Sequence, residues 1–464
     1  MNGTVKLSKV EVKGLFGLFD HIVPLRNEER VTILHGPNGV GKTVILRMIS
    51  AIFRGRYEYL VDTNFQQFLV ELSDGRAISI SRNRGNEVAE GARWALLISK
   101  DGSEESFTWF RDRTDLMRMA EYIDREVPYI TRFAEEVWSD DRTGETYGLS
   151  QLVEVFRDAL PEKLRTTVRE PAWLEDFRSS ISVHLVETQR LLMASLPQEI
   201  NRFRVRHASR IGFGSTVKSY SNDLKNRVAA ALTAYAEHSQ ALDRSFPQRM
   251  LGGAKTETLE TGDLKARMNQ LEQQRNQLKA IGLIEEDASY PFDIDTLDSA
   301  SPTQKAVMSL YVEDTENKLG VLSELKQKVD LLLGNINRKF RPNKQLRADR
   351  TTGLLVRDKR NLRIDLDSLS SGEQHELVLI YGLLFQVQPH SLVLIDEPEL
   401  SLHLTWQKAF LKELFAIIEA SDFDVLLATH SPFVVGERID LMVSLALGDE
   451  EEETPSISES KIGV

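Results

Sequence analysis

Cysteine is absent from the 464-residue sequence, which excludes disulfides, thiol nucleophiles and cysteine-ligated metal sites. No apolar run approaches the roughly 18 residues that a membrane-spanning helix needs, and the N-terminal residues lack the apolar core of a signal peptide. We therefore expect a cytoplasmic protein that does not contact a membrane. Positive charge is in deficit, with 58 Lys and Arg against 70 Asp and Glu. This balance disfavours general coating of nucleic acid but allows local basic patches.

The length predicts two or three structural units rather than one core. In the N-terminal part we expect strands at 5–12 and 31–34, a helix at 44–53, and two hairpins at 68–81 and 94–110. These hairpins alternate apolar and polar residues around Asp-Gly turns, which is typical of an antiparallel sheet. The pattern then becomes mostly helical from 114 to 177, before a strand at 183–188.

A helix-rich stretch follows from about 197 to 340. One heptad seam consists of Leu322, Leu325, Val329, Leu332 and Ile336, and a weaker one of Leu264, Met268, Leu271 and Leu278. Apolar residues with this spacing indicate helices that pack along one face. The seams suggest a short antiparallel helical hairpin, although ordinary packing inside one lobe would give the same pattern.

The C-terminal part returns to a mixture of strands and helices. Its expected elements are a hairpin at 354–365, a helix at 373–385, a strand at 392–395, a helix at 406–418 and a strand at 425–428. The two strands are uninterrupted apolar runs, which are typical of a parallel sheet buried on both faces. Beyond Gly448 the chain is acidic, and we expect that tail to be solvated or disordered.

The turn after the strand at 31–34 matches the phosphate-binding P-loop at every fixed position. Its residues are Gly36, Pro37, Asn38, Gly39, Val40, Gly41, Lys42 and Thr43. Glycines allow backbone N–H groups to converge on phosphate, and the N-terminus of the following helix adds a favourable dipole. We expect Lys42 to reach the β- and γ-phosphates and the Thr43 hydroxyl to ligate Mg²⁺.

Two carboxylates, Asp396 and Glu397, follow the apolar strand at 392–395. Side chains at this end of a strand lie at the edge where α/β sheets bind ligands. Asp396 is suited to the Mg²⁺ shell, and Glu397 to orienting or deprotonating the attacking water.

A third motif, Leu369-Ser370-Ser371-Gly372-Glu373-Gln374, precedes that strand and opens a helix. Hydroxyl and N–H donors at a helix N-terminus form an anion site. A capping box between Ser370 and Glu373 would explain the same residues. The position of the motif ahead of the two acids favours a functional role.

The order of these motifs, ending in Ala428-Thr429-His430, resembles the ABC ATPases and more narrowly their SMC, RecF and OLD branch. Asp396-Glu397-Pro398-Glu399 with Leu402-His403 is similar to the OLD-like bacterial ATPases, which are frequent in anti-phage systems such as Septu and PARIS. The motifs cover about residues 5–60 and 350–445, and the middle matches only in layout.

The resemblance implies an α/β fold, an ABC-type P-loop NTPase head with a mixed sheet and helices, split by a helical or short coiled-coil insertion. We accordingly expect four parts. They are an N-terminal half of the head with an antiparallel β subdomain (1–190), the insertion (191–345), a C-terminal half of the head (346–447) and the acidic tail (448–464).

The resemblance also implies ATP and Mg²⁺ as cofactors and roles for individual residues. Ser370 and Gly372 would contact the γ-phosphate of ATP bound to a second subunit, so that a homodimer or higher homo-oligomer completes the sites. His430 would touch the γ-phosphate as the switch histidine; without the family, a structural hydrogen bond would explain it better. Residues 399–403 would form the D-loop, where His403 replaces the Asp of transporters and Leu404 a proline.

The family's glutamine that senses Mg²⁺ should connect the head to the insertion. Gln189 follows the strand at 183–188 and fits this position, whereas Gln66 and Gln67 are alternatives.

Basic residues gather between Arg338 and Arg363, where ten Lys and Arg (338, 339, 341, 344, 347, 350, 357, 359, 360 and 363) meet two Asp (349 and 358). A second cluster consists of Arg202, Arg204, Arg206 and Arg210. These clusters predict a DNA or RNA surface. A charged surface that balances an acidic chain, or a face that docks a partner, is the alternative.

The leading hypothesis is an ATP-hydrolysing sensor of an anti-phage defence system that controls a separate effector, a nuclease or toxin, through ATP-dependent assembly. The sequence shows no metal-nuclease constellation, and we expect no C-terminal Toprim domain because the chain ends soon after His430. The effector activity would belong to another polypeptide or to residues 190–340. The alternative is a RecF- or SMC-like ATPase of DNA repair or maintenance. A transporter subunit fits less well, because the insertion is large.

Overall fold

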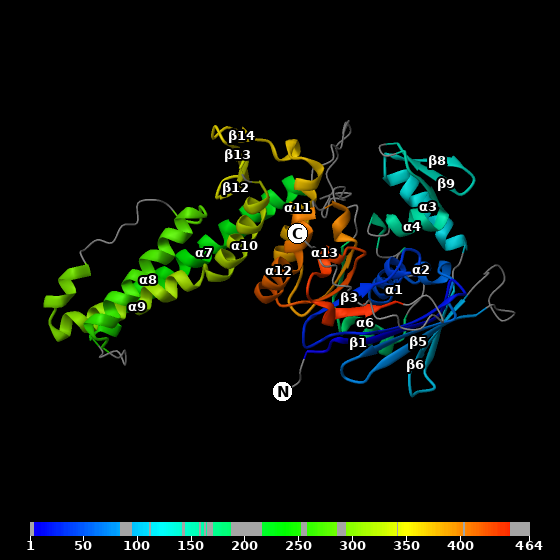
Figure 1. Ribbon diagram of the computed structural model, residues 1–464, viewed down its shortest axis with the longest axis horizontal. Helices are drawn as coiled ribbons and strands as arrows, with labels where there is room; N and C mark the ends of the chain where they lie inside the picture. The colour runs from blue at the N-terminus through cyan, green and yellow to red at the C-terminus, as the bar shows by residue number, and fades with distance from the viewer. Residues whose placement is uncertain are drawn as a thin grey trace, which may run out of the picture. The chain divides into compact units, whose positions relative to one another are not determined.

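The computed structural model describes residues 4–83, 95–110, 113–141, 144–156, 159–161, 164, 170–186, 216–251, 258–284, 294–340, 342–401 and 404–445. The chain forms two compact units, which Figure 1 shows as ribbons. The sheet unit comprises Met1–Thr188, Gln388–Leu400 and Phe423–Val464, and the helical unit Gln189–Val387 and Ser401–Asp422. Residues 346–387, which we expected in the C-terminal half of the head, therefore belong to the helical unit.

A five-stranded parallel sheet forms the centre of the sheet unit. Its spatial order is β11 (Val183–Val186), β15 (Leu392–Asp396), β16 (Asp424–Ala428), β3 (Val31–His35) and β17 (Met442–Ser444). All five residues of β15 and the first four of β3 are buried, which is why these strands are uninterrupted apolar runs. The predicted parallel strands are confirmed.

A six-stranded antiparallel sheet accompanies it. The order is β2 (Phe19–Pro24), β1 (Leu7–Leu15), β4 (Gln67–Leu72), β5 (Ala77–Asn83), β6 (Ala95–Lys100) and β7 (Ser106–Phe110). The two predicted hairpins are β4–β5 and β6–β7. Buried side chains of α1 (Lys42–Arg54), α2 (Tyr57–Asp62) and α6 (Ala172–Ser179) join both sheets in one hydrophobic core.

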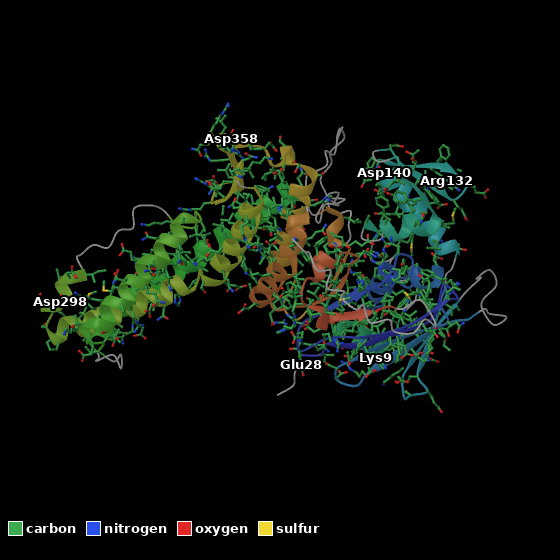
Figure 2. All side chains as sticks on the ribbon, in the orientation of Figure 1. Lys9, Glu28, Arg132, Asp140, Asp298 and Asp358 are labelled. Carbon is green, nitrogen blue, oxygen red and sulfur yellow. The ribbon has the colours of Figure 1, made fainter. Side chains whose placement is uncertain are left out.

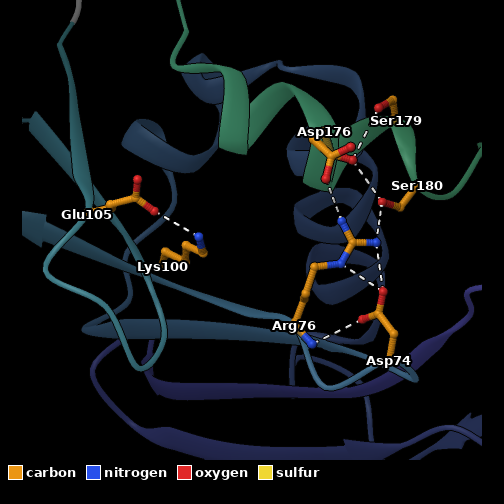
Figure 3. Close-up of polar contacts among 7 residues, drawn as sticks. All are labelled: Asp74, Arg76, Lys100, Glu105, Asp176, Ser179 and Ser180. Carbon is orange, nitrogen blue, oxygen red and sulfur yellow. Dashed lines mark hydrogen bonds and ion pairs between the residues drawn. The ribbon is translucent and has the colours of Figure 1, made fainter.

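Arg76 fastens the turn between β4 and β5 to α6, as Figure 3 shows. Its guanidinium donates to Asp74 at 2.7 Å, to Asp176 at 2.7 Å and to the Ser180 hydroxyl at 2.8 Å. One side chain thus fixes both the turn and the C-terminal end of a helix that follows it by about 100 residues. The network holds α6 against the hairpin whose strands form the core.

The interval 114–177 is only partly helical, so the expectation for it is wrong in part. Between α3 (Arg113–Glu126) and α4 (Leu149–Val155) lies a three-stranded antiparallel sheet of β8 (Ile130–Ala134), β9 (Val137–Asp140) and β10 (Thr146–Gly148). Four of the five β8 residues are exposed, so this strand lacks the apolar alternation that sequence reasoning needs. These elements surround a separate small core that contains Trp138.

The helical unit contains α7 (Thr216–Leu251), α8 (Thr261–Ala280), the 3₁₀ turn η2 (Ile294–Ser299), α9 (Pro302–Gly320) and α10 (Ser323–Phe340). In α7 and α9, Arg249 pairs with Asp314 at 2.5 Å and Asp243 with Lys318 at 2.6 Å. From the first pair to the second, the residue number falls in α7 and rises in α9, so these two helices are antiparallel. None of the helices in the described ranges combines the length and the apolarity needed to cross a membrane.

The two predicted heptad seams do not form a hairpin with each other. Near the start of α8, the Leu259 N–H donates to the Ser309 hydroxyl, and further along α8 Arg267 binds Glu316. Residue numbers thus rise together in α8 and α9, so the two helices run in the same direction. The helix α10 contacts α11, α12 and β12. The expected antiparallel hairpin of the two seams is therefore wrong, and the antiparallel pair in this unit is α7 with α9.

The remaining elements of the helical unit follow α10 in the sequence. They are β12 (Lys344–Asp349), β13 (Gly353–Asp358), β14 (Arg363–Ile364), α11 (Ser371–Tyr381), the π-helical turn η4 (Gly382–Gln386) and α12 (Leu404–Ser421). The hairpin predicted at 354–365 is confirmed as β13–β14, and β12 adds a strand that was not predicted. Figure 2 shows Asp358 at this small sheet and Asp298 at the far end of the helices.

A buried ion triad connects three helices of this unit. The Lys339 ammonium at the end of α10 contacts the carboxylates of Glu376 in α11 and Glu413 in α12, the latter at 2.8 Å. The three side chains are 3%, 2% and 6% exposed. The ammonium also lies 5.7 Å from the centre of the Trp406 ring. Buried carboxylates without a cation are unfavourable, so Lys339 is the residue that allows these helices to pack together.

We expect Lys339→Met to lower the free energy of unfolding of the helical unit by about 3–5 kcal/mol, since it removes the closest cation from two buried carboxylates. Urea unfolding followed by the fluorescence of Trp406 measures the loss. The control is Lys328→Met, which removes an (i, i+4) pair with Glu324 on the same helix. It should cost about 0.5 kcal/mol or less. Equal losses in the two variants would contradict the importance of the triad.

Candidate functional site

The predicted P-loop lies between β3 and α1, where a phosphate-binding turn must be. Gly39 and Gly41 have positive φ angles of 87° and 100°, which favour glycine. A Cβ atom at Gly36 would lie 2.8 Å from the Leu445 carbonyl oxygen, and one at Gly41 would lie 2.4 Å from the Leu15 side chain. The loop therefore fits only with glycine at these points, and its N–H groups and the α1 N-terminus form the expected anion cradle.

Lys42, the first residue of α1, is 4% exposed. Its ammonium donates to the carbonyl oxygens of Gly36 at 2.8 Å and Pro37 at 2.9 Å, and lies 3.2 Å from Nδ1 of His430. Burial lowers the pKa of Lys42, and the negative charge of Glu397 opposes this shift. The cation is thus held across the P-loop, in reach of any phosphate that the loop binds.

The two carboxylates stand at the end of β15 as predicted. Asp396 is 6% exposed, and its Oδ1 accepts a hydrogen bond from the Thr43 hydroxyl at 3.0 Å. Glu397 has a positive φ of 43°, and its N–H donates to the Ala428 carbonyl oxygen at 2.9 Å. The two carboxylates have different partners, since Asp396 accepts from Thr43 whereas Glu397 lies beside His430.

His430 follows β16 and lies between the cation and the second acid. Its Nε2 is 3.3 Å from Oε1 of Glu397, while its Nδ1 faces Lys42. A neutral ring with the proton on Nε2 satisfies both contacts, because it donates to the carboxylate and accepts from the ammonium. The structure thus brings together five predicted site residues, Lys42, Thr43, Asp396, Glu397 and His430.

These residues fit a nucleotide with Mg²⁺. A hydroxyl and a carboxylate, Thr43 and Asp396, are the hard oxygen ligands that Mg²⁺ takes from a protein when phosphate oxygens and water complete its shell. Among the described residues no group of three or more His, Cys, Asp or Glu could hold a metal ion. The donor set therefore suits a metal that arrives with phosphate better than a metal held by the protein alone.

The third motif begins α11 in the helical unit. Ser370 is the N-cap residue and forms the capping box with Glu373 in both directions. Ser370 and Ser371 are exposed, and Gly372 is half-buried. The capping-box interpretation is thus confirmed, and the N-terminus of α11 remains accessible to a ligand.

The remaining predicted positions are less informative. Gln189, residues 402 and 403 of the D-loop and the cluster from Arg202 to Arg210 lie outside the described residues. Of the alternatives, Gln67 donates through its side-chain amide to the Ser79 hydroxyl at 2.7 Å, and the Gln66 side chain lies against Gly14.

Sequence reasoning missed two side chains near the site. The Glu399 carboxylate accepts a hydrogen bond from the His430 backbone N–H at 2.7 Å, and so fixes the loop that carries the histidine. His35 directly precedes the P-loop, and burial together with the charge of Lys42 lowers its pKa. The Asp-Glu-Pro-Glu motif contained a signal for Glu399, whereas nothing in the sequence distinguished His35.

A phage protein is similar in sequence to part of this chain. Protein ea59 of Escherichia phage lambda is 31% identical over 133 residues, which are 29% of this chain and 24% of ea59. The chain thus spans about a quarter of that relative's length.

Solved SMC head domains are also similar to this chain. One from Pyrococcus furiosus, with an extended coiled coil and bound to the C-terminal domain of ScpA, has a TM-score of 0.32 at 12% identity. The alignment covers 96% of this chain and 94% of that chain. One from Thermotoga maritima has a TM-score of 0.31 at 12% identity, with 95% and 94% covered.

The family comparison covers most of the molecule. Residues 31–436 match the family described as "AAA domain, putative AbiEii toxin, Type IV TA system". This range begins at β3, directly before the P-loop, and ends after His430, so it includes every predicted site residue. The assignment to the ATPases with a P-loop head and a helical insertion is thereby confirmed, and the chain belongs to this family of AAA-domain ATPases.

Proposed function

We propose that the protein hydrolyses ATP and uses the cycle to regulate a separate effector, a nuclease or toxin, in anti-phage defence. The observation that carries the proposal is the contact chain Lys42–His430–Glu397 beside the Thr43–Asp396 pair. A cation, a histidine and a carboxylate in line, next to a Mg²⁺ ligand pair, are the groups that phosphoryl transfer to water requires. The family description, which names a toxin of a type IV TA system, supports a link to an effector.

Each residue has a distinct role in this proposal. Bound Mg²⁺–ATP supplies the phosphoanhydride that is cleaved. Thr43 and Asp396 hold the metal, and Lys42 binds the β- and γ-phosphates. Glu397 orients or deprotonates the attacking water, and His430 links that carboxylate to the phosphate-binding cation. Since Glu397 already accepts from His430, the pair is positioned before the nucleotide arrives.

A second copy would complete the site. Ser370 and Gly372 lie at the accessible N-terminus of α11, where hydroxyl and N–H donors can attract an anion. If they contact the γ-phosphate of a partner's ATP, two nucleotides are buried in a homodimer. A preference of a few kcal/mol for the associated state is then enough to make ATP a switch for a bound effector.

Variants with defects on opposite sides of the interface test the composite site. Lys42→Ala should abolish hydrolysis because the phosphates lose their cation. Ser370→Arg should abolish it because the bulky side chain blocks the approach of the partner's γ-phosphate to the N-terminus of α11. A mixture should regain part of the wild-type rate, since one site in each mixed dimer has both halves intact. Phosphate release measures the rate.

Glu397→Gln serves as the control, because it should retain ATP and stabilise the dimer in size-exclusion chromatography with light scattering. Mixing Lys42→Ala with Glu397→Gln gives no site with both an intact P-loop and an intact water-activating residue. That mixture should stay inactive. If the mixture of Lys42→Ala with Ser370→Arg recovers no hydrolysis, a site shared between subunits is contradicted.

Binding of nucleic acid is the second candidate function, and the sheet of β12, β13 and β14 favours it. The inner face of this sheet packs on α7 and α10 through buried Leu346, Leu354 and Val356. Its strand pairing places Arg357 beside Arg363, with Lys359 and Arg360 in the connecting turn.

This basic surface (Arg347, Arg357, Lys359, Arg360 and Arg363) keeps its charge. Within the described ranges, none of the five side chains has a carboxylate ion-pair partner, and Arg357 donates to the Asn361 carbonyl oxygen. The carboxylate of Asp358 accepts from the N–H groups of Arg360 and Leu362. The Asp358 carboxylate thus binds the backbone of the turn, and the cations remain available to a phosphate backbone.

Neutralising Arg357, Arg360 and Arg363 to Gln should weaken DNA or RNA binding uniformly across sequences. It should also reduce the slope of log K against log salt by up to about 0.9 per cation for duplex DNA. Fluorescence anisotropy at several salt concentrations measures both. Exchange of Arg118 and Arg125, exposed cations of α3, is the control and should leave the slope unchanged. An unchanged slope in the triple variant would favour the effector-regulating function alone.

A further inference from the structure

Glu373 presents an electrostatic problem at the N-terminus of α11. Its Oε2 accepts from the Ser370 N–H at 2.8 Å and from the Ser370 hydroxyl at 3.0 Å. The carboxylate therefore holds the same hydroxyl that a γ-phosphate would need. It also places a negative charge beside the donors that should attract an anion.

Lys344 resolves this problem from the first position of β12. Its ammonium lies 3.0 Å from Oε1 and 2.8 Å from Oε2 of Glu373, so it contacts both carboxylate oxygens. The two side chains are 25% and 16% exposed, which weakens screening by solvent relative to an open surface pair. Burial opposes ionisation of Glu373, yet the hydrogen bonds from Lys344 and Ser370 hold its pKa below the ordinary value.

The lysine comes from a rigid part of the helical unit. It lies five residues after Lys339, whose buried triad fixes the end of α10 to α11 and α12. Glu373 and Glu376 are one helical turn apart on α11, and Lys344 contacts the first of these carboxylates while Lys339 contacts the second. The joint between α10 and β12 therefore fixes both the first turn and the body of α11.

We propose that Lys344 is a positioning residue for the composite ATP site. Its ammonium neutralises Glu373, so that Ser370 and the N-terminus of α11 can bind the γ-phosphate of ATP held by a partner subunit. The proposal rests on the function proposed above. The Lys344 ammonium pairs with the carboxylate, so that the Ser370 hydroxyl can leave Glu373 for a phosphate oxygen. Lys344 itself does not contact the nucleotide.

The test measures ATP-dependent association in the Glu397→Gln background by sedimentation velocity. Lys344→Gln should raise the ATP concentration for half-maximal dimerisation about tenfold, since an unpaired carboxylate then faces the phosphate. The double variant Lys344→Gln with Glu373→Gln should restore the original value, because glutamine keeps the capping box without the charge. Restoration by a second substitution is a readout that mere loss of folding stability would not give.

Lys328→Gln is the matched control, since it removes a partly buried lysine of α10 paired with Glu324 at 2.9 Å. It should leave the ATP dependence unchanged. An unshifted Lys344→Gln variant, or a double variant that stays defective, overturns the role of Lys344 alone. If the Glu397→Gln parent fails to associate with ATP, the proposed composite site is overturned and the role of Lys344 falls with it.

Discussion

The hydrogen bond between Thr43 and Asp396 joins residues 353 positions apart. The candidate site depends on the parallel strand pairing that brings these two residues together. The P-loop follows β3, and the acids follow β15. Both strands pair in parallel with β16, which lies between them. Because parallel strands end at the same edge, the phosphate cradle, the carboxylates and the histidine after β16 meet there. Any change in strand register would separate them.

The parts of this arrangement that sequence reasoning predicted are those with a local chemical signature. The P-loop needs glycines where φ is positive and where there is no room for a side chain, so its shape nearly determines its sequence. Buried parallel strands are apolar throughout, and the acids directly follow one of them. The sequence therefore contained the sheet unit's centre and its site almost completely.

Other parts could not be predicted, because their signals are not local. An apolar seam shows which face of a helix is buried, but neither its partner nor its direction. For this reason α8 and α9 were not recognised as running in the same direction. The strand β8 is mostly exposed, so it shows no alternation. The strand β12 has two buried apolar residues between polar ones, too few to distinguish it from a loop.

Charge density was equally ambiguous until burial was known. The cluster between Arg338 and Arg363 forms one basic patch in the sequence, yet those of its members that the structure describes differ in environment. Lys339 compensates buried carboxylates, and Lys344 pairs with the capping glutamate of α11. Arg357 and its neighbours have no carboxylate partner among the described residues. In the first two environments the positive charge is paired within the helical unit.

The chain passes between the two units at points next to the functional residues. It leaves the helical unit after Val387, just before β15, and returns at Ser401, soon after Glu397. It crosses again at Phe423, directly before β16, the strand that leads to His430. Two residues near these crossings, Glu397 and Asp422, have positive φ angles of 43° and 55°, a strained conformation for a side-chain-bearing residue. The backbone therefore links the helical unit to β15 on both sides of Asp396 and Glu397, and to the start of β16. The chain enters and leaves the strand that carries the two acids from the helical unit, so the sequence neighbours of this strand on either side belong to the other unit.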